Sequence, residues 1–530
     1  MSLPGRFAAA DPPEVANGWT LRRMTPPSRL FGANGLRTGP DGRLYVAQVS
    51  GSQISALDLE TGEIESISAT GSDIVAPDDL AFDQAGNIYV TEVLNARVSM
   101  LDTRGRSRVI RGDIPIANGI TMHRGRLFIG ECREGGRLLE LDLDGGEPRV
   151  ILDNIPMTNA MEVGPDGLLY FPVMGANEIW RIDPDGGAPE TVVTGLGVPD
   201  SVKFDAEGYI VSTQAHSGQV LRIDPRNGEK TVLADLSPGL DNLAFAGDRL
   251  FVSNFSGEIT EVLGAGRTRA VLPGGFNWPL GLTAAGDTLY VADGPFIYAM
   301  TGGGAPRVAG MLFTPGYPGY TRGIASSGPG ELTVTTSSGQ VSRYRPDAAT
   351  SEVLADGFDQ LYGVALAPDG AAVVADLGTG RVSSVCDGRI DEVCAGLDAP
   401  TGVAVAPDGE ILVAESGAGR VVAVAGGRTR TVLDGLQCPH GLAVSGGVLY
   451  AIDAHAKALV AVDLGSGVRQ HVAGGLPVGA PPGVIPKPMP AMPPFSGPQG
   501  PFTGLAAGPD GTLFVSADTD GSVLALSRAG

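Results

Sequence analysis

The chain has 530 residues and a formal net charge of −22, from 37 Lys and Arg residues against 59 Asp and Glu residues. This acidic balance argues against a protein that binds the phosphate backbone of nucleic acids, because such proteins need clustered Lys and Arg. Hydrophobic residues make up 43% of the sequence and charged residues 18%, so the chain can form a core and is not a disordered polymer.

The sequence also bears on where the protein works. No stretch approaches the roughly 18 consecutive apolar residues of a membrane span. The first residues, Met1 to Phe7, lack the apolar run of a secretory signal. The four cysteines have no CxxC spacing and are expected to be reduced, buried thiols. We therefore expect a cytoplasmic protein that meets neither nucleic acid nor membrane and whose partner is a small-molecule substrate.

One unit recurs along the chain. In each copy, a small or polar residue and usually a Gly lead into four short runs with strand-like alternation, and a turn of Pro-Asp-Gly type follows the first run. In the first copy these strands are expected at 36–38, 44–47, 54–58 and 64–67. No ten-residue stretch has a convincing 3.6-residue period, so helices should be few or absent.

The unit returns twelve times with a period of about 40 residues, which is typical of a β-propeller blade. Two positions before the first apolar residue of the innermost strand, copies one to six carry Asn34, Asp78, Asn118, Asn159, Asp200 and Asp241. Copies seven to twelve carry Leu280, Arg322, Tyr362, Thr401, His440 and Thr503. Because this change falls halfway, we predict an all-β chain of two six-bladed β-propellers in tandem, over 1–266 and 267–530. One ring of twelve blades is the alternative.

The chain ends bear on how the rings close. The last copy stops after its third strand, so two extended segments, 19–24 and 267–272, remain to serve as outermost strands. We expect 19–24 to close blade six and 267–272 to close blade twelve, which would remove exposed sheet edges. The reverse assignment stays open.

A Pro-rich insertion at 475–501 lengthens the interval between the last two copies. Since proline cannot join a strand ladder, this segment is expected to run extended across one face. Loops of this length are usually lids, binding loops or disordered linkers. A lid over the second propeller and a disordered insertion are both open.

The Asn and Asp residues of the first propeller predict a metal site, because the innermost strands of a propeller surround its central channel. Two carboxylates about 6 Å apart repel by about 3 kcal/mol at an effective dielectric near 20, so three Asp side chains near one axis need protons or a cation. Oxygen ligands without Cys or His suit Ca²⁺ best, with Mg²⁺, Mn²⁺ or Zn²⁺ as alternatives. The predicted ligands are Asn34, Asp78, Asn118, Asn159, Asp200 and Asp241. In the competing interpretation these residues only cap turns, but the second propeller has the same turns without Asn or Asp.

Further polar residues are expected around this ring. The candidates for substrate binding are Glu92, Glu131, Asn242 and Asn254. Acidic residues also end the corresponding strands of the second propeller, so blade structure alone explains most of them. Asp200 and Asp241 are candidate general bases, and His216, in the loop after the second strand of blade five, is a weaker one.

Three blade starts carry a family resemblance. Ala117-Asn118-Gly119-Ile120, Pro199-Asp200 and Leu240-Asp241-Asn242-Leu243 resemble the metal-ring motifs of the regucalcin/gluconolactonase and paraoxonase families. The resemblance implies a six-bladed propeller in which a divalent ion polarises a lactone or ester carbonyl. It covers the first 270 or so residues, and Asn34 stands where those families usually carry a Glu. We accordingly expect a metal-dependent hydrolase of a lactone or small ester.

The second propeller offers a different chemistry. Its half of the chain looks like a generic NHL-type propeller, and Cys438-Pro439-His440-Gly441-Leu442 is similar to the Pro-His-Gly blade start of the virginiamycin B lyase family. A lyase or isomerase site with His440 as base and Tyr362 as acid is therefore an alternative. Its candidate residues are Arg322, Tyr362, His440 and His455. A third interpretation is a non-catalytic binding scaffold, since a propeller fold implies no reaction.

Overall fold

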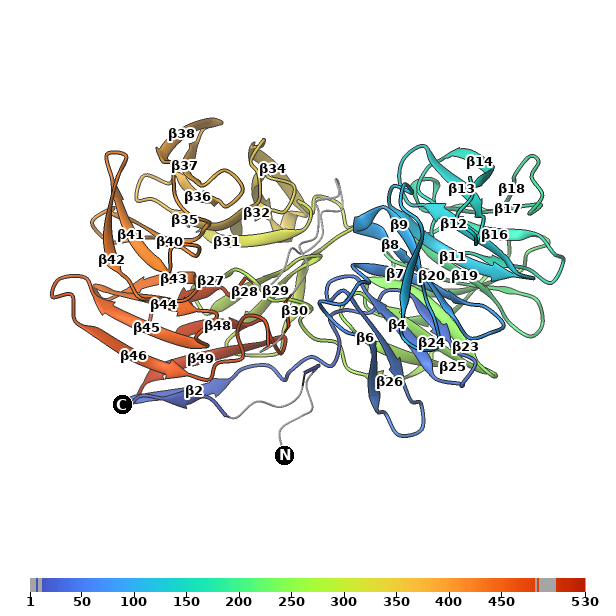
Figure 1. Cartoon of the computed structure of the whole chain (residues 1–530), viewed down its shortest axis with the longest axis horizontal. Helices are drawn as coiled ribbons and strands as arrows, with labels where there is room; N and C mark the ends of the chain where they lie inside the picture. The colour runs from blue at the N-terminus through green and yellow to red at the C-terminus, as the bar shows by residue number, and fades with distance from the viewer. Residues whose placement is uncertain (1–5, 8–11, 482–483, 486–501, 530) are drawn as a thin grey trace. The chain divides into compact units, whose positions relative to one another are not determined.

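The computed structural model describes residues 6–7, 12–481, 484–485 and 502–529 (Figure 1). Its strands form twelve antiparallel sheets, of which eleven have four strands and one has five. The only helical elements in this part of the chain are the 3-10 turns η1 (Val93–Asn95), η2 (Met174–Ala176) and η3 (Pro346–Ala348). The predicted all-β fold of tandem propellers is confirmed. No helix within the described ranges is long and apolar enough to cross a membrane.

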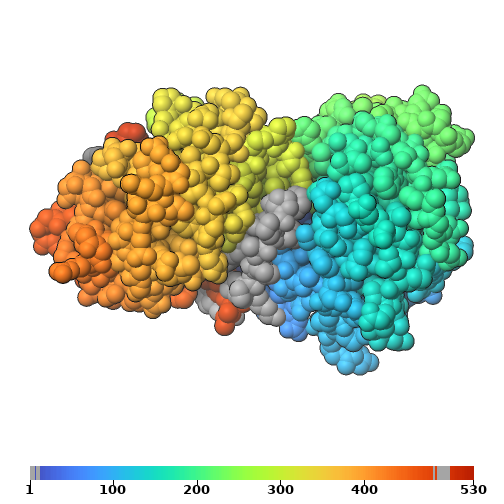
Figure 2. Space-filling model, turned by 90° about the horizontal axis from the view of Figure 1, so that it is seen from above, coloured from blue at the N-terminus to red at the C-terminus, as the bar shows by residue number. Residues whose placement is uncertain are grey.

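Residues 29–275 form the first propeller, the compact blue-to-green body of Figure 2. Its innermost strands contact one another in the order β3, β7, β11, β15, β19 and β23, and β23 returns to β3, so six blades close a ring. The strands are β3 (Leu36–Thr38), β4 (Leu44–Gln48), β5 (Gln53–Leu57), β6 (Ile64–Ser68), β7 (Pro77–Phe82), β8 (Ile88–Glu92), β9 (Arg97–Leu101), β10 (Ser107–Arg111), β11 (Ala117–His123), β12 (Arg126–Glu131), β13 (Gly136–Leu141), β14 (Arg149–Ile155), β15 (Glu162–Val163), β16 (Leu169–Val173), β17 (Glu178–Ile182), β18 (Glu190–Val193), β19 (Pro199–Phe204), β20 (Ile210–Gln214), β21 (Gln219–Ile223), β22 (Lys230–Asp235), β23 (Leu240–Ala246), β24 (Arg249–Asn254), β25 (Ile259–Gly264) and β26 (Arg267–Leu272).

The second propeller contains the chain from Phe276 onward together with the segment before Arg29. Its innermost strands run in the order β27, β31, β35, β39, β43 and β47, with β47 against β27. The strands are β1 (Glu14–Val15), β2 (Trp19–Arg23), β27 (Leu282–Ala285), β28 (Thr288–Asp293), β29 (Phe296–Thr301), β30 (Arg307–Met311), β31 (Thr321–Gly328), β32 (Glu331–Thr336), β33 (Val341–Arg345), β34 (Thr350–Ala355), β35 (Leu361–Leu366), β36 (Ala372–Asp376), β37 (Arg381–Cys386), β38 (Arg389–Cys394), β39 (Pro400–Val405), β40 (Ile411–Glu415), β41 (Arg420–Ala425), β42 (Arg428–Leu433), β43 (Pro439–Ser445), β44 (Val448–Asp453), β45 (Ala458–Asp463), β46 (Arg469–Gly474), β47 (Leu505–Ala507), β48 (Leu513–Ala517) and β49 (Ser522–Arg528).

The expected assignment of the two closing strands was wrong. Strand β26 stays in blade six beside β25, and β2 completes blade twelve beside β49. The physical reason is local, because Ala265 and Gly266 both have positive φ and form a tight turn that returns β26 directly along β25. Blade twelve has no such neighbour and takes its fourth strand from the N-terminal segment. The division between the units accordingly lies at 275/276, and residues before 29 belong with the second unit rather than the first.

Apolar side chains fill the space between neighbouring blades. Leu36 and Val46 of blade one pack with Phe251 and Leu272 of blade six, and all four are at most 2% exposed. In blade twelve, Trp19 of the closing strand is 5% exposed and meets Tyr450 edge-on, with 6.1 Å between ring centroids. Both rings are therefore held by cores between sheets, which fixes the innermost strands around each channel. Most of the Pro-rich insertion predicted as a lid or disordered segment lies outside the described residues.

Candidate functional site

A β-bulge in the innermost strand presents the predicted ring residues. In β11, Ala117 pairs with Glu131 and Ile120 pairs with Ile129, so two residues on one strand face a single residue on β12. The ladders of β7, β19 and β23 skip the residues at 78–79, 200–201 and 241–242 in the same way. A bulge takes its residues out of the ladder and re-aims their side chains. Here it takes Asp78, Asn118, Asp200 and Asp241 out of the ladders.

Hydroxyl groups of the second strands hold these bulges in place. Ser253 Oγ of β24 accepts a hydrogen bond from Asn242 N at 3.0 Å and donates to Asn34 O of the next blade at 2.7 Å. Thr213 Oγ1 of β20 donates in the same manner to Asp241 O. One buried hydroxyl thus links a bulge to the neighbouring innermost strand, which keeps the ring residues in register around the axis.

Among the predicted ring residues, Asn34 and Asp241 are in direct contact. Asn34 Nδ2 donates to Asp241 Oδ2 at 2.9 Å, while Asn34 Oδ1 accepts from Val49 N at 3.1 Å. Asn159 Nδ2 lies 3.3 Å from Met174 Sδ. The ring members that are at most 9% exposed are Asp78, Asn118, Asn159, Asp200 and Asp241. Asn34 therefore supports Asp241 with its amide nitrogen instead of offering a free oxygen to the centre.

All three ring carboxyls have raised pKa values, although a side-chain hydrogen bond with Asp241 lowers that of Asp200. Burial is the main cause for each, and it raises the pKa of Asp200 to about 7. The pKa values of Asp78 and Asp241 lie well above their usual range, first because of burial and then because of the charge of Asp200. No Lys or Arg is among the charges that act on these three within the described chain. The ring is thus an acidic site without a protein counter-ion.

Two oxygen atoms of the ring lack partners. Asn118 Oδ1 and Asp200 Oδ1 are buried and accept no hydrogen bond from the described residues. An unsatisfied buried acceptor costs about 1–3 kcal/mol, so both oxygens are open to a hydrogen-bond donor or a cation. His, Cys, Asp and Glu side chains of the described residues form no group of three that could hold a metal ion by themselves. A cation here would need amide as well as carboxylate oxygens.

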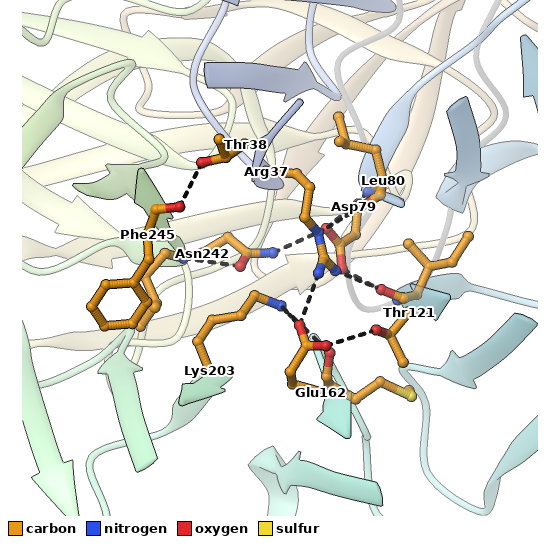
Figure 3. Close-up of polar contacts among 12 residues, drawn as sticks. Arg37, Thr38, Asp79, Leu80, Thr121, Glu162, Lys203, Asn242 and Phe245 are labelled. Atoms are coloured by element: carbon orange, nitrogen blue, oxygen red, sulfur yellow. Dashed lines mark hydrogen bonds and ion pairs between the residues drawn. The ribbon is translucent and has the colours of Figure 1, made fainter. Parts of the chain in front are cut away.

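One residue past Asp78 and Asp241 in the sequence, a buried hydrogen bond joins blades six and two. Asn242 Nδ2 of blade six donates to Asp79 Oδ1 of blade two at 3.1 Å. Blade one lies between them with Gly35, where an added Cβ would come within 2.9 Å of Asp79 Oδ1. The missing side chain lets Asp79 and Asn242 meet. Asn242, predicted to bind substrate, belongs to this second layer (Figure 3).

The other predicted substrate-binding residues have structural partners. Glu92 is fully buried, accepts two hydrogen bonds from Arg97 at 2.7 Å each and accepts another from Val75 N at 2.7 Å. Glu131 is likewise bound by Arg133 and Arg137. Acidic residues at the corresponding strand ends of the second propeller also accept backbone N–H groups, which indicates a role in blade structure. We leave Glu92 and Glu131 out of the proposed site.

Asn254 and His216 do not join the ring either. Asn254 Nδ2 donates to Ser237 O and Pro238 O at 3.1 Å each, which fixes a turn. His216 is exposed in the loop after β20. The geometry that gathers the ring residues therefore does not extend to these two.

The corresponding place in the second propeller is filled by an aromatic side chain. Phe502 is 3% exposed, and its ring centroid lies 4.9 Å from that of Tyr362 and 5.6 Å from that of His440. Arg322 stacks over Tyr362 at 4.5 Å and donates to Leu361 O at 2.8 Å. These contacts make an apolar, aromatic centre where the first propeller has acids and amides.

His440 is held as a neutral ring in this centre. Its Nδ1 accepts from Thr503 N at 3.4 Å, and its Nε2 lies 3.4 Å from Cys438 Sγ. Burial lowers the pKa of His440 to about 4. His455, the remaining member of the alternative site, is exposed. No contact in the described chain favours the lyase alternative, and we do not carry it further.

Sequence reasoning missed Asp79, Arg37, Glu162 and Lys203, which all lie on the innermost strands of the first propeller (Figure 3). A signal was present in the repeat alignment. Positions one and three residues after each ring residue carry charged side chains in some blades and small or uncharged ones in others. Charge on a strand that lines a channel needs partners, so these positions were candidates for a second cluster.

The chain matches the sequence profile of one protein family over residues 32–255, described as SMP-30/Gluconolactonase/LRE-like region. This match lies within the first propeller and confirms the predicted resemblance there. The chain matches no curated protein.

Several solved structures are similar to parts of this chain. They include virginiamycin B lyase from Staphylococcus aureus (18% identity, 52% of this chain and 96% of that chain, TM-score 0.39) and a gluconolactonase from Xanthomonas campestris (15%, 48% and 96%, TM-score 0.39). A third is regucalcin from Agrobacterium tumefaciens C58, named as a calcium-binding protein (22%, 44% and 85%, TM-score 0.36). Each alignment spans about half of this chain, and we draw no activity from them.

Proposed function

We propose that the first propeller is a hydrolase of lactones or small esters that depends on a divalent cation, with Ca²⁺ as the best-suited ion. The observation that carries the proposal is the group of buried ring residues Asp78, Asn118, Asn159, Asp200 and Asp241, whose carboxyls have raised pKa values and no protein counter-ion. The match of residues 32–255 to a family whose description includes gluconolactonase supports the choice of reaction.

The donor set suits a hard cation. Ca²⁺ prefers six to eight oxygen ligands from carboxylates and amides, and the residues that would hold it are Asp78, Asn118, Asp200 and Asp241. The unpartnered Asn118 Oδ1 is an atom that fits this role. When bound, such an ion supplies a Lewis acid that polarises the substrate carbonyl.

Asp200 is the residue we assign to proton transfer. Hydrolysis adds water across the acyl carbon–oxygen bond, so one group must accept a proton from water and return it to the leaving alkoxide. Asp241 Oδ2 already accepts a hydrogen bond from Asn34, whereas Asp200 Oδ1 accepts none. Asp200 therefore has a carboxylate oxygen available for this exchange. Asn34 acts on the reaction by positioning Asp241.

The test is a substrate panel assayed with and without a chelator. Purified protein is dialysed against a chelator and then offered lactones, small esters and elimination substrates, with Ca²⁺, Mg²⁺, Mn²⁺ or Zn²⁺ restored one at a time. We expect hydrolysis of at least one lactone or ester that disappears on chelation and returns with one of the ions. The proposal would be contradicted if an ester were hydrolysed at the same rate with and without the chelator. It would also be contradicted if the protein showed only elimination activity.

Cation affinity should depend steeply on pH. The metal-free ring keeps protons near neutral pH because the folded pKa of Asp200 is about 7, against 3.8 for an unperturbed Asp, and those of Asp78 and Asp241 are also raised. Binding a cation must displace these protons, so the association constant for Ca²⁺ should rise with pH, by about tenfold per pH unit for each proton released. Calorimetric titration at pH values from about 6 to 8 measures this slope. An affinity independent of pH would exclude the ring as the binding site.

A further inference from the structure

A second polar cluster lies on the same innermost strands, three residues beyond the ring in each blade. Its positions hold Arg37, Ala81, Thr121, Glu162, Lys203 and Ala244. At about 3.3 Å per strand residue, this layer is displaced by about 10 Å along the channel from the ring. The strand geometry thus gives the channel two differently charged ends.

Arg37, Glu162 and Lys203 point toward one another from three blades (Figure 3). Glu162 Oε2 accepts from Arg37 Nη1 at 2.8 Å and lies 3.2 Å from Lys203 Nζ. Arg37 also donates to Leu80 O at 3.0 Å and to Ile120 O at 2.9 Å. Two cations therefore share one carboxylate. Lys203 is 6% exposed, so its charge is buried with this single acidic partner in contact.

The cluster has more hydrogen-bond donors than acceptors. Arginine carries five N–H donors and lysine three. Arg37 donates three hydrogen bonds, and Lys203 has two long contacts, at 3.2 Å to Glu162 and 3.4 Å to Met161 O. Glu162 accepts from Arg37, Lys203 and, at 3.3 Å, Thr121 Oγ1. Donors on both cations thus remain unused while the carboxylate is nearly saturated, which favours an anion as the missing partner.

A cavity opens beside this cluster. It has a volume of about 260 Å³, and its lining includes the charged residues Arg37, Glu162 and Lys203 and the aromatic residues Phe204 and Phe245. Ligand pockets usually measure about 300–1,000 Å³ and combine an apolar wall with a few polar groups. This cavity has the same mixture of apolar and polar lining but is slightly smaller than that range. It would hold a small molecule with a negative end and an apolar body.

The cavity is separate from the ring. Between the two lie the hydrogen bond from Asn242 to Asp79 and the contacts of Arg37 with backbone carbonyls of the neighbouring blades. The charge of Asp79 acts on Lys203, but its oxygens accept hydrogen bonds from Asn242, Leu80 N and Ile120 N, and no hydrogen bond joins it to Arg37 or Lys203 in the described chain. A ligand in the cavity would therefore meet Lys203 and Arg37 without reaching the ring carboxyls.

We propose that this end of the first channel is a binding site for a small organic carboxylate with an apolar body. The carboxylate bonds to Lys203 Nζ and to the unused N–H groups of Arg37, and the body packs against Phe204 and Phe245. Charge-assisted hydrogen bonds of this kind are about twice as strong as neutral ones. The site is independent of the proposed hydrolysis, because it uses none of the ring residues.

Benzoate is the probe, with benzamide and benzylammonium as its neutral and cationic counterparts. In calorimetric or NMR titrations of the full chain, we expect benzoate to bind and the two counterparts to bind at least about tenfold more weakly, since benzamide offers no anionic oxygen and benzylammonium has no acceptor. Lys203→Met keeps the aliphatic stem and removes the charge, and it should weaken benzoate binding by about tenfold or more. The matched control is Lys230→Met, at an exposed lysine of the same propeller, which should leave binding unchanged.

Crystals soaked with 4-bromobenzoate give a readout that needs no variant. The anomalous signal of bromine is expected between Phe204 and Phe245, with the carboxylate on Lys203. Equal binding of benzoate and benzamide, unchanged affinity in Lys203→Met, or bromine only at other positions would overturn the proposal. Any of these results would mean that the cluster serves only to hold the three blades together.

Discussion

Replacing Asp200 with Asn is expected to lower kcat/KM for the proposed hydrolysis by about 10²–10⁴-fold, the usual contribution of a positioned general base. The substitution keeps the size of the side chain and removes the carboxylate that we assign to proton transfer. It also removes one of the charges that would hold the cation, so Ca²⁺ affinity should fall in the same variant. Steady-state kinetics with calcium titrations measure both effects.

The same substitution should stabilise the metal-free protein. The folded pKa of Asp200 is about 7 and its unperturbed value is 3.8, so the stability linked to its protonated form is present below pH 3.8 and is lost as the pH rises through about 7. Above that range an ionised Asp200 destabilises the fold by at most about 4 kcal/mol at 1.36 kcal/mol per pH unit. Asn carries no such cost. A higher melting temperature together with lost activity separates a functional carboxyl from a structural one.

Asp153→Asn is the matched control, because Asp153 is exposed on β14 of the same propeller and its replacement changes the net charge equally. We expect it to leave activity, calcium affinity and melting temperature unchanged. If Asp200→Asn retained full activity, or if it lowered the melting temperature of the metal-free protein, the role assigned to Asp200 would be wrong.

Replacing Gly119 with Ala should destabilise the first propeller by about 3 kcal/mol or more, at the upper end of the usual cost of overpacking. An added Cβ would collide with the backbone of Asn159 and would come within 2.8 Å of Ala160 N. Neither blade can move aside, because cores on both sides fix the innermost strands. In a domain of this size, the loss corresponds to a fall of about 6–12 °C in melting temperature, which scanning calorimetry measures.

Gly112→Ala is the control for this substitution. Gly112 precedes the same innermost strand, and an added Cβ there meets nothing within 4 Å. We expect no measurable change in melting temperature. If Gly119→Ala lowered the melting temperature only slightly, the innermost strands would be less tightly packed around the channel than in the structure. The positions of the ring residues described above would then be in doubt.

The repeat and the strand pattern predicted most of this fold. Expected strands at 36–38, 44–47, 54–58 and 64–67 agree closely with β3, β4, β5 and β6, because alternating side chains and turn residues act locally. Closure of the rings could not be predicted this way. The choice between the two candidate closing strands depends on a tight turn at Ala265 and Gly266, where both residues have positive φ. The spacing of the repeats does not indicate such a turn.

The proximity of Asp78, Asp200 and Asp241 could be predicted because each occupies the same place in its blade, whereas a bound cation stays a prediction. The partners of the ring residues were harder to foresee. Asn34 directs its oxygen to Val49 N, and Glu92 is enclosed by Arg97 and Ser99. Such hydrogen bonds depend on side-chain rotamers and on neighbouring strands, which residue type and spacing do not specify. The second propeller shows the same limit, since Phe502 enters its centre from the end of a long insertion.

The most direct test of a cation-binding ring is the anomalous diffraction of crystals soaked with Mn²⁺ after removal of bound ions by a chelator. We predict one strong peak on the axis of the first propeller, coordinated by oxygens that include Asn118 Oδ1, and no such peak in Asp200→Asn crystals, which lack one charge of the ring. An axis occupied only by water while Mn²⁺ binds elsewhere, or an equal peak in both proteins, would contradict the account.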